Sequence, residues 1–98
     1  MRAGTVTYRT TLANVLAVLT DVDPHGLEPG SPDGASSDEY EMEAVDLVRI
    51  LLKAGAVTTH DVEAVWMRWF SESLVLRLGP PQMAHLVDRL NALMDGAR

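Results

Sequence analysis

The chain has 98 residues and a formal charge of −6 at pH 7, because 14 acidic side chains outnumber 8 Lys and Arg side chains. This length suits one domain with one hydrophobic core. The negative charge argues against a nucleic-acid binder, which needs clustered cations for its phosphate contacts. The chain contains no cysteine, so disulfides, thiolate catalysis and cysteine-based zinc sites are excluded.

The first predicted helix covers about residues 8–22. Its apolar residues recur at helical spacing along one face. The pattern stops at Asp23-Pro24 because proline disfavours a helical conformation in the residue before it. The apolar run resembles the centre of a secretion signal, but Asn14 interrupts it and acidic residues follow it. We therefore expect a folded helix in a cytoplasmic protein, and no stretch approaches the roughly 18 apolar residues of a membrane span.

A loop is predicted at residues 23–36. The stretch from Pro24 to Ser37 includes three Pro, three Gly and three Ser, and these residue types are typical of turns and loops. A loop of this length in so small a domain often carries a function.

The second predicted helix covers residues 37–54. The sequence Ser36-Ser37-Asp38-Glu39 has the order of a capping box, in which Ser36 and Glu39 satisfy free N–H groups of the first turn. Gly55 is expected to end this helix in a left-handed conformation.

The third predicted helix covers residues 59–73, with Thr58 or Thr59 as its N-cap. Three aromatic side chains, Trp66, Trp69 and Phe70, share one face of it. We expect them in the core because an all-helical domain needs large residues at its centre. A partner or dimer surface at this face is the alternative. Leucine at every second position from 74 to 78 predicts a short extended segment after this helix.

A fourth helix is predicted at residues 81–95, because Pro80-Pro81 suits a first helical turn and an apolar stripe begins at Met83. The predicted fold is therefore all-α. It is a small single-domain bundle of about four helices, with a long acidic loop between the first two.

Acidic residues are distributed unevenly along the chain. Nine of the fourteen lie between Thr10 and Val48, a stretch without Lys or Arg. Such a segment creates a field that attracts cationic surfaces and repels nucleic acid and anionic lipid. We therefore predict a protein partner with a basic surface, and we expect neither nucleic acid nor a membrane as a partner.

The sequence contains no phosphate-binding glycine loop, no nucleophile elbow and no zinc-binding His-Glu-x-x-His helix. We therefore expect no enzymatic activity and no cofactor. A metal-dependent or enzymatic factor is an alternative, since Asp21, Asp23, His25 and Glu28 carry ligands that suit a hard cation. Solvated loop acids are the commoner interpretation of such a group.

Two short motifs support a resemblance. Asp23-Pro24-His25-Gly26 is followed by Asp38-Glu39-Tyr40, and this order resembles a family of small bacterial all-helical proteins of unknown function. That family has the pattern (Trp)-Asp-Pro-x-Gly followed by Asp-Glu-Tyr, and some of its members are immunity-like proteins encoded beside polymorphic toxins. In this chain Val22 stands where the family has the aromatic residue. The resemblance implies a helical fold and a role in binding a toxin.

The leading hypothesis is a non-enzymatic protein-binding module, an immunity-type inhibitor whose acidic loop and second-helix start cover a basic surface of a toxin. A small homodimer with a structural or regulatory role, formed through the Trp66–Phe70 face, is the alternative. The residues predicted to contact the partner are Asp23, His25, Glu28, Asp33, Asp38, Glu39, Tyr40, Glu43 and Asp46.

Overall fold

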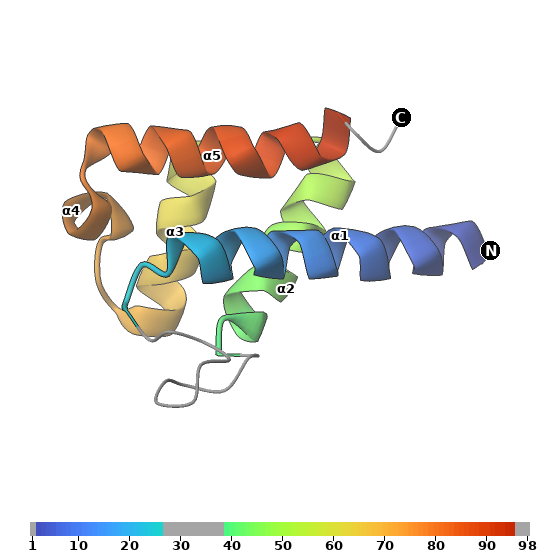
Figure 1. Ribbon diagram of the computed structural model, residues 1–98, viewed down its shortest axis with the longest axis horizontal. Helices are drawn as coiled ribbons and strands as arrows, with labels where there is room; N and C mark the ends of the chain where they lie inside the picture. The colour runs from blue at the N-terminus through green and yellow to red at the C-terminus, as the bar shows by residue number, and fades with distance from the viewer. Residues whose placement is uncertain (1, 27–38, 96–98) are drawn as a thin grey trace.

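The computed structural model describes residues 2–26 and 39–95. All regular secondary structure in these residues is helical, which confirms the predicted all-α fold. The helices are α1 (Arg2–Val22), α2 (Glu41–Ala54), α3 (Thr59–Phe70), α4 (Leu74–Leu78) and α5 (Pro80–Asp95) (Figure 1).

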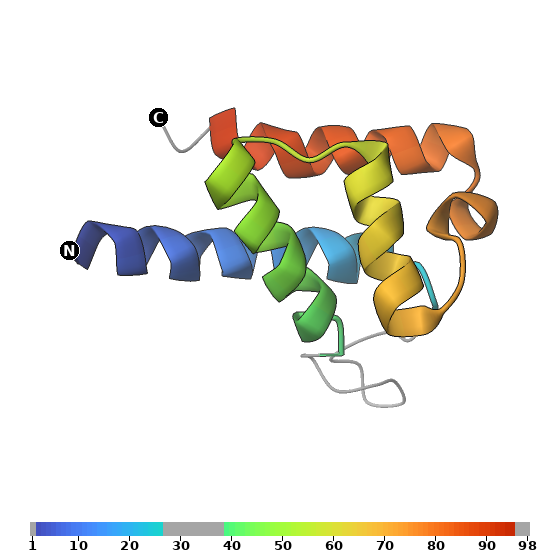
Figure 2. The same cartoon turned by 180° about the vertical axis from the view of Figure 1, so that it is seen from behind.

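The four longer helices form two crossed pairs. α1 and α5 lie side by side and run in opposite directions, as do α2 and α3, and the second pair crosses the first at a steep angle (Figures 1 and 2). α4 packs against the end of α3 and the start of α5. Of the described helices, none has both the length and the apolar character needed to cross a membrane.

The core lies between these pairs, and every helix contributes to it. Each fully buried aliphatic side chain stabilises the folded state by about 1.5–3 kcal/mol relative to an exposed one. The apolar residues that recur at helical spacing in the sequence therefore stabilise the fold when they are buried here. The largest completely buried side chains are Trp66 and Tyr40. The buried apolar residues are Val15, Val18, Leu19, Tyr40, Ala44, Leu47, Val48, Leu51, Val57, Val62, Val65, Trp66, Leu74, Met83, Leu86 and Leu90.

The α2–α3 connection follows local sequence signals. Gly55 has a φ of 85° and donates its N–H to the carbonyl of Leu51 at 2.8 Å, which confirms it as the left-handed cap of α2. Thr58 and Asp61 form a reciprocal capping box at the start of α3, with hydrogen bonds of 3.1 and 3.0 Å. The predicted start at residue 59 is therefore confirmed.

Several predicted boundaries differ from the structure. α1 begins at Arg2 rather than near residue 8. α2 begins at Glu41 rather than near residue 37, because residues 39–40 form a turn and Tyr40 takes the cap position without a capping side chain. Ser36, predicted to cap this helix, lies outside the described residues. α3 ends at Phe70 rather than at residue 73, because Ser71 adopts a left-handed conformation with a φ of 56°.

The prediction of an extended segment after α3 is wrong, because residues 74–78 form the short helix α4. Its first free N–H groups have two acceptors. The Ser73 hydroxyl accepts the Leu76 N–H at 3.2 Å, and the Glu63 carboxylate on α3 accepts the Val75 N–H at 3.0 Å. Satisfying these donors stabilises a helical turn, and Leu74 is buried beneath it.

Candidate functional site

The turn that follows α1 places His25 against the core. Asp23 has a φ of 48° and donates its N–H to the Leu19 carbonyl at 2.8 Å. Gly26 has a φ of 64° and donates its N–H to the Asp23 carbonyl at 3.0 Å. Asp and Gly are among the residues that most readily adopt positive φ. The turn therefore reverses the chain at little steric cost and directs His25 inward.

Tyr40 joins this turn to the start of α2. Its phenol donates a hydrogen bond to Oδ1 of Asp23 at 2.8 Å and accepts the backbone N–H of His25 at 3.0 Å. The Tyr40 side chain is completely buried, and burial raises the pKa of its phenol well above the ordinary value. The two motifs of the sequence, 17 residues apart at these positions, therefore meet in one hydrogen-bonded contact.

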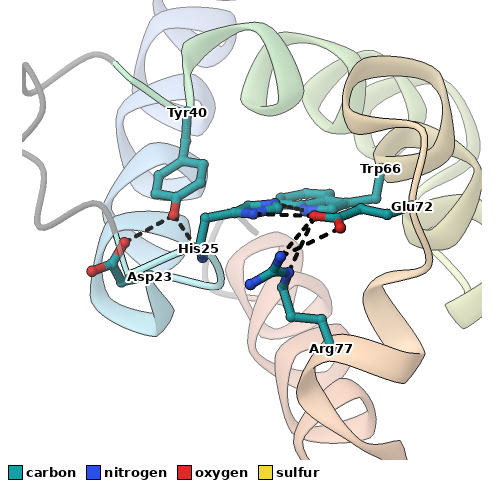
Figure 3. Close-up of polar contacts among 6 residues, drawn as sticks. All are labelled: Asp23, His25, Tyr40, Trp66, Glu72 and Arg77. Carbon is teal, nitrogen blue, oxygen red and sulfur yellow. Dashed lines mark hydrogen bonds and ion pairs between the residues drawn. The ribbon is translucent and has the colours of Figure 1, made fainter.

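The His25 ring is held by both of its nitrogen atoms (Figure 3). Nε2 accepts a hydrogen bond from Nε1 of Trp66 at 2.9 Å, and Nδ1 lies 3.3 Å from Oε1 of Glu72. One face of the ring packs on Phe70, with 4.1 Å between ring centroids. Because an indole nitrogen can only donate, Nε2 of His25 carries no proton. The neutral ring therefore carries its proton on Nδ1, facing the carboxylate.

Electrostatics favour this neutral ring. Burial lowers the pKa of His25 below its usual value, and the nearby Arg77 guanidinium acts in the same direction. The carboxylates of Glu72 and Asp23 oppose this effect without outweighing it. Arg77 itself lies 3.0 Å from Glu72 and so shares the carboxylate with His25. Both ring nitrogens are engaged within the protein, so this geometry suits a structural contact between the turn and α3 better than proton transfer to a ligand. We call this group of hydrogen-bonded and ion-paired residues the clasp; its members are Asp23, His25, Tyr40, Trp66, Glu72 and Arg77.

Glu43 is buried at the start of α2, although we predicted it on the partner-binding surface. Only 4% of the residue is exposed, and its Oε1 has no hydrogen-bond partner among the residues that the structure describes. Burial raises the pKa of Glu43, and the neighbouring charges of Asp46 and Glu39 raise it further. Burial without a hydrogen-bond partner for one oxygen destabilises the charged form of this carboxylate.

Asp46 faces the α2–α3 contact. It accepts a hydrogen bond from Nε1 of Trp69 at 2.6 Å, and its carboxylate lies 3.9 Å from Arg49 and 4.0 Å from Arg68. Its side chain is 13% exposed. Its position has an internal explanation, because it satisfies the indole N–H of a half-buried tryptophan.

The predicted partner-binding residues thus fall into three groups. Glu39 is exposed in the turn just before α2. Five others belong to internal contacts: Asp23, His25 and Tyr40 to the clasp, and Glu43 and Asp46 to the packing of α2. Glu28, Asp33 and Asp38 lie outside the described residues.

The structure also describes residues of the two alternative sites, the aromatic face proposed for a homodimer and the acidic group proposed for a metal ion. Trp66 is fully buried and bonded to His25, which confirms the predicted core position; Trp69 and Phe70 are half-buried beside it. Asp21 forms an ion pair with Arg89 at 2.7 Å. In the part of the chain that the structure describes, no group of three His, Asp or Glu side chains is placed to hold a metal ion.

Sequence reasoning did not identify the residues that complete the clasp. Trp66 lies 41 positions from His25, and Glu72 and Arg77 lie in a segment predicted to be helix end and extended chain. No local pattern couples these positions to His25. Comparisons with protein families, with curated proteins and with solved structures found no match for this chain.

Proposed function

We propose that this chain is a non-enzymatic protein-binding module, an immunity-type inhibitor that uses the start of α2 to cover a basic surface of a toxin. One observation carries the proposal. Glu39 and Glu41 are exposed beside Met42, whose exposed fraction is 53%. Among the described residues, neither carboxylate forms an ion pair. We call Glu39, Glu41 and Met42 the acidic surface.

Part of this arrangement has a structural explanation. Negative charge near a helix N-terminus interacts favourably with the helix dipole, typically by about 0.3–1 kcal/mol, which accounts for Glu41. The dipole does not account for the half-exposed Met42, which follows Glu41 directly in the sequence. An exposed apolar side chain close in sequence to exposed carboxylates has the composition of an interface anchor with a polar rim.

The clasp supports the same proposal by positioning the surface. Tyr40 is completely buried and hydrogen-bonded immediately before Glu41, so the backbone of the acidic surface is held before any partner arrives. A preorganised surface loses less conformational entropy on binding. A cationic partner would be attracted by the carboxylates and anchored on Met42.

The test uses the protein encoded next to this chain as the partner and measures association by stopped-flow fluorescence. We expect the variant Glu39→Gln/Glu41→Gln to reduce the association rate constant by roughly tenfold at low salt, with a smaller reduction at high salt, because complementary charge acts mainly on encounter. Met42→Ala should instead increase the dissociation rate, because it removes a short-range contact.

The matched control is Asp88→Asn, which removes one exposed acid from α5 and should be compared with the single variant Glu41→Gln. Equal, small effects of the two single variants would show that only the net charge matters and would contradict the proposed surface. A partner that binds all variants as the native chain does would also contradict it.

A further inference from the structure

The His25 ring joins the turn after α1 to α3 (Figure 3). Its Nε2 accepts the indole N–H of Trp66 at 2.9 Å, and its face packs on Phe70 with 4.1 Å between the ring centroids. The planes of the His25 and Trp66 rings differ by only 3°. The indole N–H therefore points along the lone pair of Nε2, which lies in the plane of the imidazole ring.

A proton on Nε2 is incompatible with this contact. An indole nitrogen donates a hydrogen bond and cannot accept one, so a protonated ring would place two N–H groups against each other across 2.9 Å. The proton of the neutral ring is on Nδ1, which faces the Glu72 carboxylate at 3.3 Å. The neutral ring keeps its contact with Trp66, whereas the charged ring has to leave it.

The charged and titratable groups that face this ring come from several elements. Among the described residues they are Asp23 in its own turn, Tyr40 at the start of α2, Glu72 after α3 and Arg77 on α4. The α3 side chains that contact the ring are aromatic and uncharged. Burial lowers the pKa of His25 and Arg77 lowers it further, whereas Glu72 and Asp23 raise it by less.

The direction of the pH effect follows from proton linkage. A ring that has left Trp66 for water has an ordinary pKa of about 6.5, which is above the pKa of the closed clasp. Between these two values the open form binds the proton and the closed form does not. Each unit of pH decrease in this range therefore favours the open form by up to about tenfold. At neutral pH and above, this proton no longer favours opening.

Tyr40 connects the ring to the start of α2. Its phenol oxygen accepts the backbone N–H of His25 at 3.0 Å and donates to Asp23 at 2.8 Å. Both partners belong to the turn, so a displaced turn leaves this completely buried phenol without them, which is destabilising unless Tyr40 moves as well. Its carbonyl accepts the N–H of Ala44 at 3.0 Å in the first turn of α2. A displaced turn therefore also displaces the start of α2.

We propose that the clasp is a pH-sensitive switch, in which a proton on Nε2 of His25 detaches the turn from α3 and Tyr40 transmits this change to the start of α2. The aliphatic core, which includes Leu19 and Leu47, carries no titratable group, so its packing does not respond to the same proton. Glu41 directly follows Tyr40, so opening also makes the acidic surface less rigid. Only this last consequence rests on the proposed function.

The experiment records nuclear magnetic resonance spectra of the free native chain between about pH 7.5 and pH 5, a range that spans the ordinary histidine pKa. We expect the indole N–H resonance of Trp66 and the backbone amides of Glu41 and Met42 to shift with the midpoint at which Nε2 of His25 takes up its proton. The indole N–H of Trp69 is the internal control, because it donates to Asp46 at 2.6 Å and should stay in place. Circular dichroism should show unchanged helix content across the range.

Three variants assign these shifts. His25→Gln removes the titrating group and should abolish the shared midpoint, whereas His60→Gln, which removes an exposed histidine of α3, should keep it. Glu43→Gln should also keep it, and this control is needed because the raised pKa of Glu43 gives the start of α2 a second titrating group. In Tyr40→Phe, which lacks the phenol oxygen, Trp66 should still respond but the amide of Glu41 should no longer follow it.

The native chain alone can overturn the proposal. A Trp66 indole resonance that stays in place while His25 takes up its proton would show that the clasp does not open, and an unmoved Glu41 amide would show that Tyr40 transmits nothing. Loss of helix content at the same midpoint would mean general unfolding in place of a switch. Shifts that persist in His25→Gln would assign them to another group. No partner is added, so these outcomes are independent of whether the acidic surface binds a toxin.

Discussion

The clasp around His25 predicts that this protein loses stability when the pH falls below about 6.5. The His25 pKa is lowered in the folded protein by burial, relative to 6.5 in the unfolded chain. At a pH between the folded and unfolded values, the unfolded chain therefore binds more protons than the folded one. The His25 contribution to stability is fully present above 6.5, and it decreases as the pH falls towards the folded pKa.

The size of the effect follows from proton linkage. One proton taken up on unfolding changes the free energy of unfolding by up to about 1.4 kcal/mol for each pH unit. The structure explains why the folded state resists this proton: Nε2 of His25 faces the indole N–H of Trp66 at 2.9 Å, so a protonated ring would place two donors against each other. Below the folded pKa, the ring must leave Trp66 or the contact must open.

The assay measures urea unfolding by circular dichroism between about pH 7.5 and pH 5. His25→Gln removes the titrating group, so its stability should lie below that of the native chain near pH 7.5 and approach it as the pH falls. We expect the initial difference to be about 1–3 kcal/mol, because the Trp66 N–H loses a well-placed acceptor. Taking the difference at each pH cancels the contribution of the other titrating groups.

The control is His85→Gln, because His85 is exposed on α5 and should leave the pH dependence of the native chain in place. The reasoning is refuted if the native chain and His25→Gln keep a constant stability difference across this pH range. It is also refuted if the ring nitrogen shifts of His25 show a proton on Nε2 at neutral pH.

The remaining predictions concern three polar groups that are buried or partly buried, in Tyr40, Asn91 and Glu43. Tyr40→Phe keeps the packing but leaves the His25 N–H without its acceptor, so we expect a loss of about 1–3 kcal/mol in thermal or urea unfolding; unchanged stability would remove the phenol from the clasp. Asn91 on α5 accepts the N–H of Val57 at 2.8 Å and donates to its carbonyl at 3.0 Å. Asn91→Leu should cost about 2–4 kcal/mol by orphaning both groups, and Asn91→Asp, which keeps the acceptor, should cost less. Glu43 has a raised pKa, so its folded form binds the proton more tightly and stability falls as the pH rises above 4.5. Glu43→Gln should therefore stabilise the protein near pH 7 and make little difference near roughly pH 3, and a destabilised variant at neutral pH would show that Glu43 has a favourable partner.

Features that depend on neighbours within one helical turn could be predicted from the sequence. Gly55 ends α2 because glycine tolerates positive φ, and Thr58 begins α3 because its hydroxyl and Asp61 satisfy each other's backbone groups. The apolar periodicity likewise identified the four longer helices, and Trp66 as a core residue. These interactions join residues at most a few positions apart, so the local sequence contains both partners.

Only the tertiary structure decided the features that join distant segments. α4 is helical because a carboxylate on α3 accepts one of its first N–H groups, which the alternating leucines could not indicate. Tyr40 is the cap of α2, and not a surface residue, because its phenol reaches Asp23 across the α1 turn. The protonation state of His25 also depends on the tertiary structure, because the sequence alone shows only a histidine in a loop, which can be charged or neutral. Its neutral form results from burial beside an indole donor 41 residues away, and the free energy of that contact exists only when the helices pack.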